Sequence, residues 1–175
     1  MKQKLFGITT VLLIMAMSWC FTGCGTDDID ISGYADSEIV LAGLENSDAD
    51  LSGASMDDDG NVVLTIADLK ALQCETIKTE STSDKIGKVR ATGPELDTVL
   101  AAYGVSKTDF KKIRFYGADE YDIPLMNDYL SEHDIYLAFG IDGEPLDEES
   151  VPCRIIIPES DSAYWTRMVN RIEFN

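Results

Sequence analysis

The sequence predicts an α+β fold, in which short strands form mixed sheets and a few short helices pack against them. After residue 37, strand-like runs rich in β-branched and aromatic residues alternate with turn signals containing Gly, Pro, Asn and Asp. Helical periodicity is confined to three short stretches, so strands and helices do not alternate as a parallel βαβ sheet requires.

The first half of this region combines four expected strands with one short helix. Thr65 and Asp68 have the spacing of a capping box, which predicts that a helix begins there and covers residues 67–73. The strands are predicted from β-branched runs or from period-two alternation. They cover residues 37–44, 61–66, 75–80 and 85–93.

The second half begins with a helix and continues mainly as strands. Pro94 starts the helix, its apolar positions share one face, and Gly104 ends it. A shorter helix is expected near residues 126–130. The remaining strands cover residues 112–117, 135–141, 154–158 and 166–174.

The N-terminus has the features of a lipoprotein export signal. Lys2 and Lys4 precede an apolar run, residues 5–19, that is shorter than the roughly 20 residues a membrane-spanning helix needs. Phe21-Thr22-Gly23-Cys24 then places small residues before a cysteine, the pattern that precedes acylation and cleavage. We expect residues 1–23 to be a signal peptide and Cys24 to carry lipid, which anchors the protein on the extracytoplasmic face of the cell membrane.

The remaining chain divides into an expected acidic tether, residues 24–36, and one domain, residues 37–175. Loss of Lys2 and Lys4 with the signal peptide changes the formal charge from −18 to −20. Such an acidic surface excludes nucleic acid as a partner and opposes adsorption to anionic lipid.

Two cysteines remain after Cys24 is assigned to lipid. Cys74 and Cys153 can form a disulfide, because an extracytoplasmic compartment permits one. They can equally remain as buried thiols, since free cysteine packs as a small hydrophobic residue. Spacing in the sequence does not separate these alternatives.

Six motifs follow one another in a fixed order along the chain. They are the helix from Asp68 to Leu72, GPELDTVLAAYGV (93–105), GADEYDIPL (117–125), LAFGIDGEPL (137–146), ESVPCRIIIP (149–158) and RMVNRIEF (167–174). Each motif is weak alone, but together they resemble the molybdopterin-binding domain of the sulfite oxidase family, across roughly residues 37–175. The resemblance implies that family's fold of layered mixed sheets.

The resemblance implies a molybdenum held by a pterin dithiolene and by one protein thiolate. The matching stretch for that cysteine is KTESTS (78–83), which contains none. Cys74 lies too early along the chain, and Cys153 occupies a position where the family has an ordinary apolar residue. We therefore expect that the chain provides no metal ligand and binds no cofactor. The alternative is that it binds molybdopterin.

The resemblance also implies a basic site for the cofactor phosphate. Arg154 is retained and Arg167 stands at the family's usual lysine position, so the two arginines are candidates to bind a small anion or cofactor. Glu149 replaces a histidine of the family, and a carboxylate repels phosphate. The alternative is that both arginines pair with Glu149, Asp119 or Glu120.

Other chemistry-bearing residues give little signal. His133, the only histidine, lies in the polar turn SEHD, where we expect it in solvent. Tyr121, Tyr164 and Trp165 are candidates to line a remnant of the cofactor cleft, although aromatic residues in such strands are usually core.

These observations predict a lipid-anchored lipoprotein whose degenerate molybdopterin-binding-type domain binds a small ligand or a surface protein. Its surface partner is the lipid bilayer, reached through Cys24. The first alternative is a molybdopterin-dependent oxidoreductase with atypical ligation of the metal. The second is an accessory subunit of a surface complex, and an enzyme is the less expected class.

Overall fold

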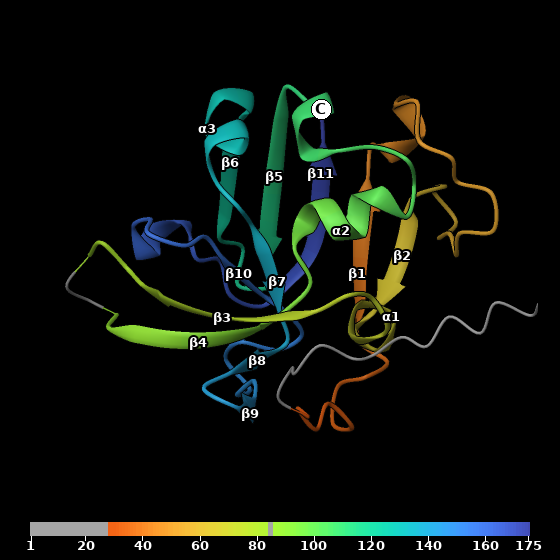
Figure 1. Cartoon of the computed structure of the whole chain (residues 1–175). Coiled ribbons are helices and arrows are strands. Elements are labelled where there is room, and N and C mark those ends of the chain that lie inside the picture. Colours follow the sequence, from red (N-terminus) through yellow and green to blue (C-terminus); the bar gives the residue numbers. More distant parts are fainter. Residues whose placement is uncertain (1–27, 84–85) are drawn as a thin grey trace, which may run out of the picture.

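The structure is a computed structural model that describes residues 28–83 and 86–175, and it confirms the predicted α+β class (Figure 1). Short strands form three sheets, and short helices lie between them. The strands are β1 (Glu38–Ala42), β2 (Val62–Thr65), β3 (Glu75–Glu80), β4 (Lys88–Gly93), β5 (Lys112–Gly117), β6 (Asp122–Met126), β7 (Tyr136–Ala138), β8 (Gly140–Ile141), β9 (Glu144–Pro145), β10 (Arg154–Ile156) and β11 (Val169–Phe174). The α-helices are α1 (Ile66–Ala71), α2 (Leu96–Ala101) and α3 (Asn127–Glu132), and the 3-10 helices are η1 (Leu44–Asn46), η2 (Lys107–Asp109) and η3 (Ser162–Tyr164).

The largest sheet has the strand order β2-β1-β11-β5-β6. β1 and β11 are parallel, and every other pair of neighbours in this sheet is antiparallel. Alternate residues of β5 are buried, among them Ile113 and Phe115, because period-two side chains of a half-covered strand face the core on one side only. β11, the C-terminal strand, is third of the five in this order and lies at the centre of the sheet.

The second sheet has the order β3-β4-β8-β9, and β7 pairs with β10 in a third. Figure 1 shows the long β3–β4 hairpin running across one end of the largest sheet. Gly93, at the end of β4, permits the close approach of β7, since an added Cβ would lie 2.0 Å from the Leu137 carbonyl oxygen. This contact joins the hairpin to the core.

Local sequence signals explain the helices. The predicted capping box is confirmed, because Thr65 Oγ1 accepts from the Asp68 backbone N–H and the Asp68 carboxylate accepts from the Thr65 N–H. In α2, the residues Leu96, Val99 and Leu100 are buried on one face, as the periodicity predicts.

Two strand predictions are wrong in detail. The expected strand 135–141 is two strands, β7 and β8, which pair with different neighbours on either side of Phe139. β6 is not among the predicted strands, and it contains Pro124. The structure places that proline in an edge strand, where a missing N–H is tolerated.

The expected tether over residues 24–36 is wrong for its described part. Ile29 is fully buried, and Ile31 and Tyr34 are also buried in the core. The Tyr34 hydroxyl donates to the Phe139 carbonyl, so this segment belongs to the domain, which begins before residue 37. The expected signal peptide and Cys24 lie outside the described residues.

Candidate functional site

Residues 78–83, which are expected to match the cysteine-bearing strand of the resembled family, lie at the end of β3 and just after it. Thr79 and Ser81 are the buried residues of this stretch, 8% and 7% exposed. Thr79 Oγ1 accepts a hydrogen bond of 3.2 Å from the backbone N–H of Glu159. The partner belongs to the segment between β10 and β11, called here the 158–166 loop.

Hydroxyl groups beyond β3 also bind the 158–166 loop. Ser81 Oγ donates to the Ser160 carbonyl oxygen at 3.3 Å, and the Thr82 N–H donates to the same oxygen at 3.0 Å. The hydroxyls of Ser83 and Ser162 lie 2.6 Å apart. This end of β3 therefore presents hydroxyl groups, and they hold the chain's own loop in place.

The shape of the loop depends on Trp165, which is 3% exposed. Its indole N–H donates to the Ile157 carbonyl oxygen at 2.8 Å and to Ser160 Oγ at 3.0 Å. Glu159 has a φ of 58°, a left-handed conformation that is unusual for a residue other than glycine. The tryptophan thus fixes the loop against the end of β10.

The two candidate arginines lie near each other beside this tryptophan. The Arg154 guanidinium is 6.0 Å from the centre of the Trp165 ring. Burial, with the nearby positive charge of Arg167, lowers the pKa of Arg154. Arg167 is more exposed and forms an ion pair of 3.5 Å with Glu149, one of the expected alternative partners. The structure therefore brings both arginines together. Of the two, only Arg167 forms an ion pair with a residue of the described chain.

Two polar atoms in this region are buried without a hydrogen-bond partner in the described part of the chain. They are Nε of Arg154 and Oγ1 of Thr166, a residue that is 1% exposed. Buried polar groups are usually satisfied, so each such atom needs an explanation. Thr166 was not singled out in the sequence, since an isolated threonine gives no signal there.

A cavity of about 220 Å³ adjoins Thr166 and Arg167. Tyr121 and Trp165 contribute aromatic surface to it, and Asp119 contributes a carboxylate. Tyr164 points elsewhere, because its ring stacks on Tyr129 with a centroid distance of 5.1 Å. The cavity has room for a small ion or group.

A larger cavity, of about 670 Å³, lies on the other side of the 158–166 loop. Pro158 and Glu159 line it, together with residues of β3, β4 and the β8–β9 turn. Its charged residues are of both signs, so it has no clear electrostatic preference. They are Lys78, Glu80, Lys88, Arg90, Asp142 and Glu159.

The two cysteines are free in the described structure and are not joined in a disulfide. Cys74 Sγ donates to the Leu69 carbonyl oxygen at 3.4 Å, and burial raises the pKa of Cys74 to about 11. Cys153 is fully buried, and burial raises the pKa of its thiol further. Both are thus inert buried thiols in this arrangement.

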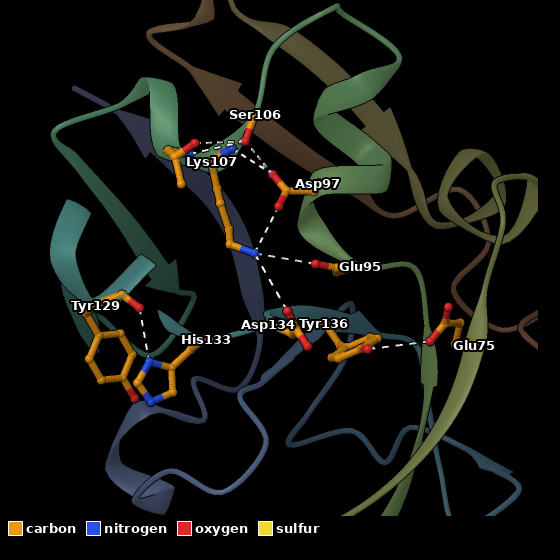
Figure 2. Close-up of polar contacts among 10 residues, drawn as sticks. Glu75, Glu95, Asp97, Ser106, Lys107, Tyr129, His133, Asp134 and Tyr136 are labelled. Atoms are coloured by element: carbon orange, nitrogen blue, oxygen red, sulfur yellow. Dashed lines mark hydrogen bonds and ion pairs between the residues drawn. The ribbon is translucent and has the colours of Figure 1, made fainter. Parts of the chain in front are cut away.

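A second polar cluster surrounds Lys107, which is only 6% exposed (Figure 2). Its ammonium group lies 2.9 Å from Asp97, 3.4 Å from Glu95 and 4.0 Å from Asp134. Burial opposes its charge, but the carboxylates outweigh that effect and raise the pKa of Lys107. A lysine held protonated in this way joins η2 to α2 and to the start of β7, and it has no nucleophilic character.

His133 is half-buried, which corrects the expectation that it lies free in solvent. Its ring stacks on Tyr129 at a centroid distance of 4.0 Å, and its Nδ1 lies 3.0 Å from the Tyr129 carbonyl oxygen (Figure 2). The histidine thus packs at the end of α3 against Tyr129, away from the chemistry expected of a catalytic base.

Metal-binding side chains do not gather anywhere in residues 28–83 and 86–175. Within these ranges, no three His, Cys, Asp or Glu residues are placed so that they could hold a metal ion. Of the helices described, none is long and apolar enough to cross a membrane.

Comparison with known proteins relates the domain to one family. The family model described as oxidoreductase molybdopterin binding domain matches residues 55–175. Among solved structures, the sulfane dehydrogenase SoxCD from Paracoccus pantotrophus is similar, with 21% sequence identity and a TM-score of 0.60. The match covers 80% of this chain and 38% of that one, so the chain spans less than half of the length of that protein. No curated protein matches the sequence.

Proposed function

The chain belongs to the oxidoreductase molybdopterin binding domain family, and on this premise we propose that it is a lipid-anchored, ligand-binding member of that family. In this proposal it binds a small anion beside Arg154, Thr166 and Arg167. It does not carry out molybdenum chemistry. The membrane anchor is the acylated Cys24 predicted from the export signal.

The residues present do not fit a molybdenum bound through a protein thiolate. The family position for that thiolate falls in the stretch that holds Thr79, whose hydroxyl accepts from the Glu159 N–H. A neutral hydroxyl is a poor substitute for a soft thiolate ligand. The two thiols of the described chain are buried elsewhere, and Cys153 Sγ is directed at its neighbouring carbonyl of Arg154. The described residues therefore support no catalytic step that uses a molybdenum cofactor.

The observation that carries the proposal is the pair of unsatisfied atoms, Arg154 Nε and Thr166 Oγ1. Thr166 lines the cavity of about 220 Å³, and Arg154 packs against Trp165, which also lines it. In this proposal an anion in the cavity accepts from both atoms and offsets the repulsion between Arg154 and Arg167. Leaving such groups unpaired costs about 1–3 kcal/mol each, so a ligand that pairs them gains binding energy. The cavity of about 220 Å³ limits that ligand to a small oxyanion or to the acidic group of a larger molecule.

Isothermal titration with sulfate and phosphate tests this proposal, using the mature protein in detergent. We expect binding by the natural chain and a loss of about 10–100-fold in affinity for Arg154→Met, since a charge-assisted hydrogen bond contributes about 1.5–3 kcal/mol. Arg171→Met, on β11, removes the same charge and should bind normally. Equal affinities for the natural chain and Arg154→Met would overturn the proposal.

A further inference from the structure

The N-terminal segment of the described chain is locked onto the domain at its first residues. Ile29 is fully buried against Gly140, at the start of β8, where an added Cβ would lie 2.8 Å from Ile29 Cγ1. Lys70, in the last turn of α1, donates to the Ile29 carbonyl oxygen at 2.6 Å and lies 3.4 Å from the Asp28 carboxylate. The chain is thus held by a backbone contact as well as by burial.

Tyr34 provides a second attachment nearby. Its hydroxyl donates to the Phe139 carbonyl oxygen and accepts from the Leu146 N–H at 3.1 Å. Releasing the segment would expose Ile29 and Tyr34 and leave these polar groups without partners. The attachment point of the chain therefore coincides with one end of the domain, formed by residues 28–36, the end of α1 and the β8–β9 hairpin. We call this end the anchor end (Figure 1).

The length of chain between this lock and the predicted lipid is short. Ile29 comes five positions after Cys24, so an acylated Cys24 lies at most about 18 Å from Ile29 even when the chain between them is fully extended. A domain of this size has a diameter of about 40 Å. A free tether reaching residue 37 would instead span about 47 Å, enough for any orientation. The locked chain is too short to reach around the domain.

From these lengths we propose that the anchor end faces the bilayer and lies within about 18 Å of it, while α3 and the C-terminal end of β11 face away. Figure 1 shows α3 and the C-terminus at the opposite end from the β8–β9 hairpin. This orientation rests on the proposed lipid anchor. Its consequence is that one defined surface of the domain, the anchor end, faces the membrane.

The charge of the anchor end indicates that the tether, and not adsorption, sets this orientation. Exposed carboxylates there include Asp28, Asp142, Glu144 and Asp147. Anionic headgroups repel such a surface over a Debye length of about 8 Å at physiological ionic strength. The acyl chains must therefore supply the attraction to the bilayer. The short segment between Cys24 and Ile29 then sets the orientation of the domain.

Energy transfer to labelled lipid headgroups tests the orientation. The mature lipoprotein is reconstituted from detergent into phosphatidylcholine vesicles that carry an acceptor dye on their headgroups. A donor dye is attached at Glu144→Cys, at the start of β9, or at Asp128→Cys, in α3, both of which remove one exposed acid. Cys74 and Cys153 are buried and should not react in the folded protein.

We expect transfer to be severalfold more efficient from position 144 than from position 128. Inserting about twelve Gly and Ser residues after Asp27 should remove the difference, because a flexible linker of that length lets the domain rotate freely. Equal transfer from both positions, with the protein still bound to vesicles, would overturn the orientation and leave the lipid anchor standing. Failure of the protein to remain on the vesicles would overturn both.

Discussion

Lys107 and Arg154 are both removed from solvent in large part, but their surroundings are opposite. Three carboxylates surround the Lys107 ammonium group, the nearest at 2.9 Å, and burial does not prevent the pKa of Lys107 from rising. Arg154 has an unsatisfied Nε and a second arginine nearby, and its pKa is lowered by burial and by Arg167.

The difference separates a structural ion cluster from a site that a ligand can complete. Around Lys107, the fold supplies every partner that the buried charge needs, so removing one member leaves the others unpaired. Around Arg154, the fold leaves donors unused and places like charges together, which raises the free energy of the empty site. Four substitutions test this distinction, from the largest expected effect to the smallest.

Lys107→Met should destabilise the domain by about 3–5 kcal/mol, because it leaves Glu95, Asp97 and Asp134 without their shared cation. Urea unfolding followed by circular dichroism measures this change. Lys111→Met, at an exposed position nearby, is the matched control and should change stability by less than about 0.5 kcal/mol. Similar stabilities for the two variants would contradict a structural role for the cluster.

Asp97→Asn should cost about 1–3 kcal/mol at pH 7, where the lost charge weakens the bonds to Lys107. Burial opposes ionisation of Asp97, but its bonds with Lys107 hold the pKa below the ordinary value of 3.8. This stabilisation is therefore complete above pH 3.8 and is lost as the pH falls through the lower, folded-state pKa. Unfolding free energies of the two proteins should converge at that acidic end. A difference that persists unchanged there would contradict the assignment.

Unlike the substitutions in the Lys107 cluster, Arg154→Met should not destabilise the domain. Without an anion, the variant should be as stable as the natural chain or more stable by up to about 1 kcal/mol. The reason is that the substitution removes an unsatisfied, repelled cation and puts in its place an apolar side chain that can pack beside Trp165. Thermal unfolding in a buffer without sulfate or phosphate measures this. A loss as large as that of Lys107→Met would show that Arg154 is a structural residue.

Thr166→Val gives the smallest expected change, a stabilisation of less than about 1 kcal/mol, because a methyl group replaces a hydroxyl that has no partner among the described residues. The same variant should bind sulfate more weakly. Destabilisation by about 1 kcal/mol or more would indicate that Thr166 Oγ1 makes a hydrogen bond within the folded chain.

Local signals in the sequence predicted much of the fold. The capping box of Thr65 and Asp68 and the alternation along β3 and β5 are governed by neighbours in the chain, so they could be recognised directly. The packing of Ile29 and Tyr34 could not, because the polar, acidic stretch around them suggested a tether, and their burial depends on Gly140 and Phe139, which are distant in the sequence.

For the site, the family pattern selected Arg154 and Arg167 as candidates to bind an anion or cofactor, which stays a prediction, and the structure places Arg167 close enough to lower the pKa of Arg154. The family pattern gave no indication of Thr166 or of the hydroxyl contacts that hold the 158–166 loop on β3. These depend on how two loops meet in space, which a single sequence does not specify. The lipid anchor at Cys24 and the absence of a cofactor stay predictions.

Metal analysis of the protein purified from the membranes of its native host tests the central claim most directly. Residues 78–83, where the family resemblance leads us to expect a thiolate ligand, contain no cysteine, and Thr79 there binds the Glu159 N–H. We therefore expect far less than one molybdenum atom per chain and no visible absorption from a molybdenum cofactor. One tightly bound molybdenum atom per chain would contradict this expectation and identify the protein as an oxidoreductase with a different metal ligand.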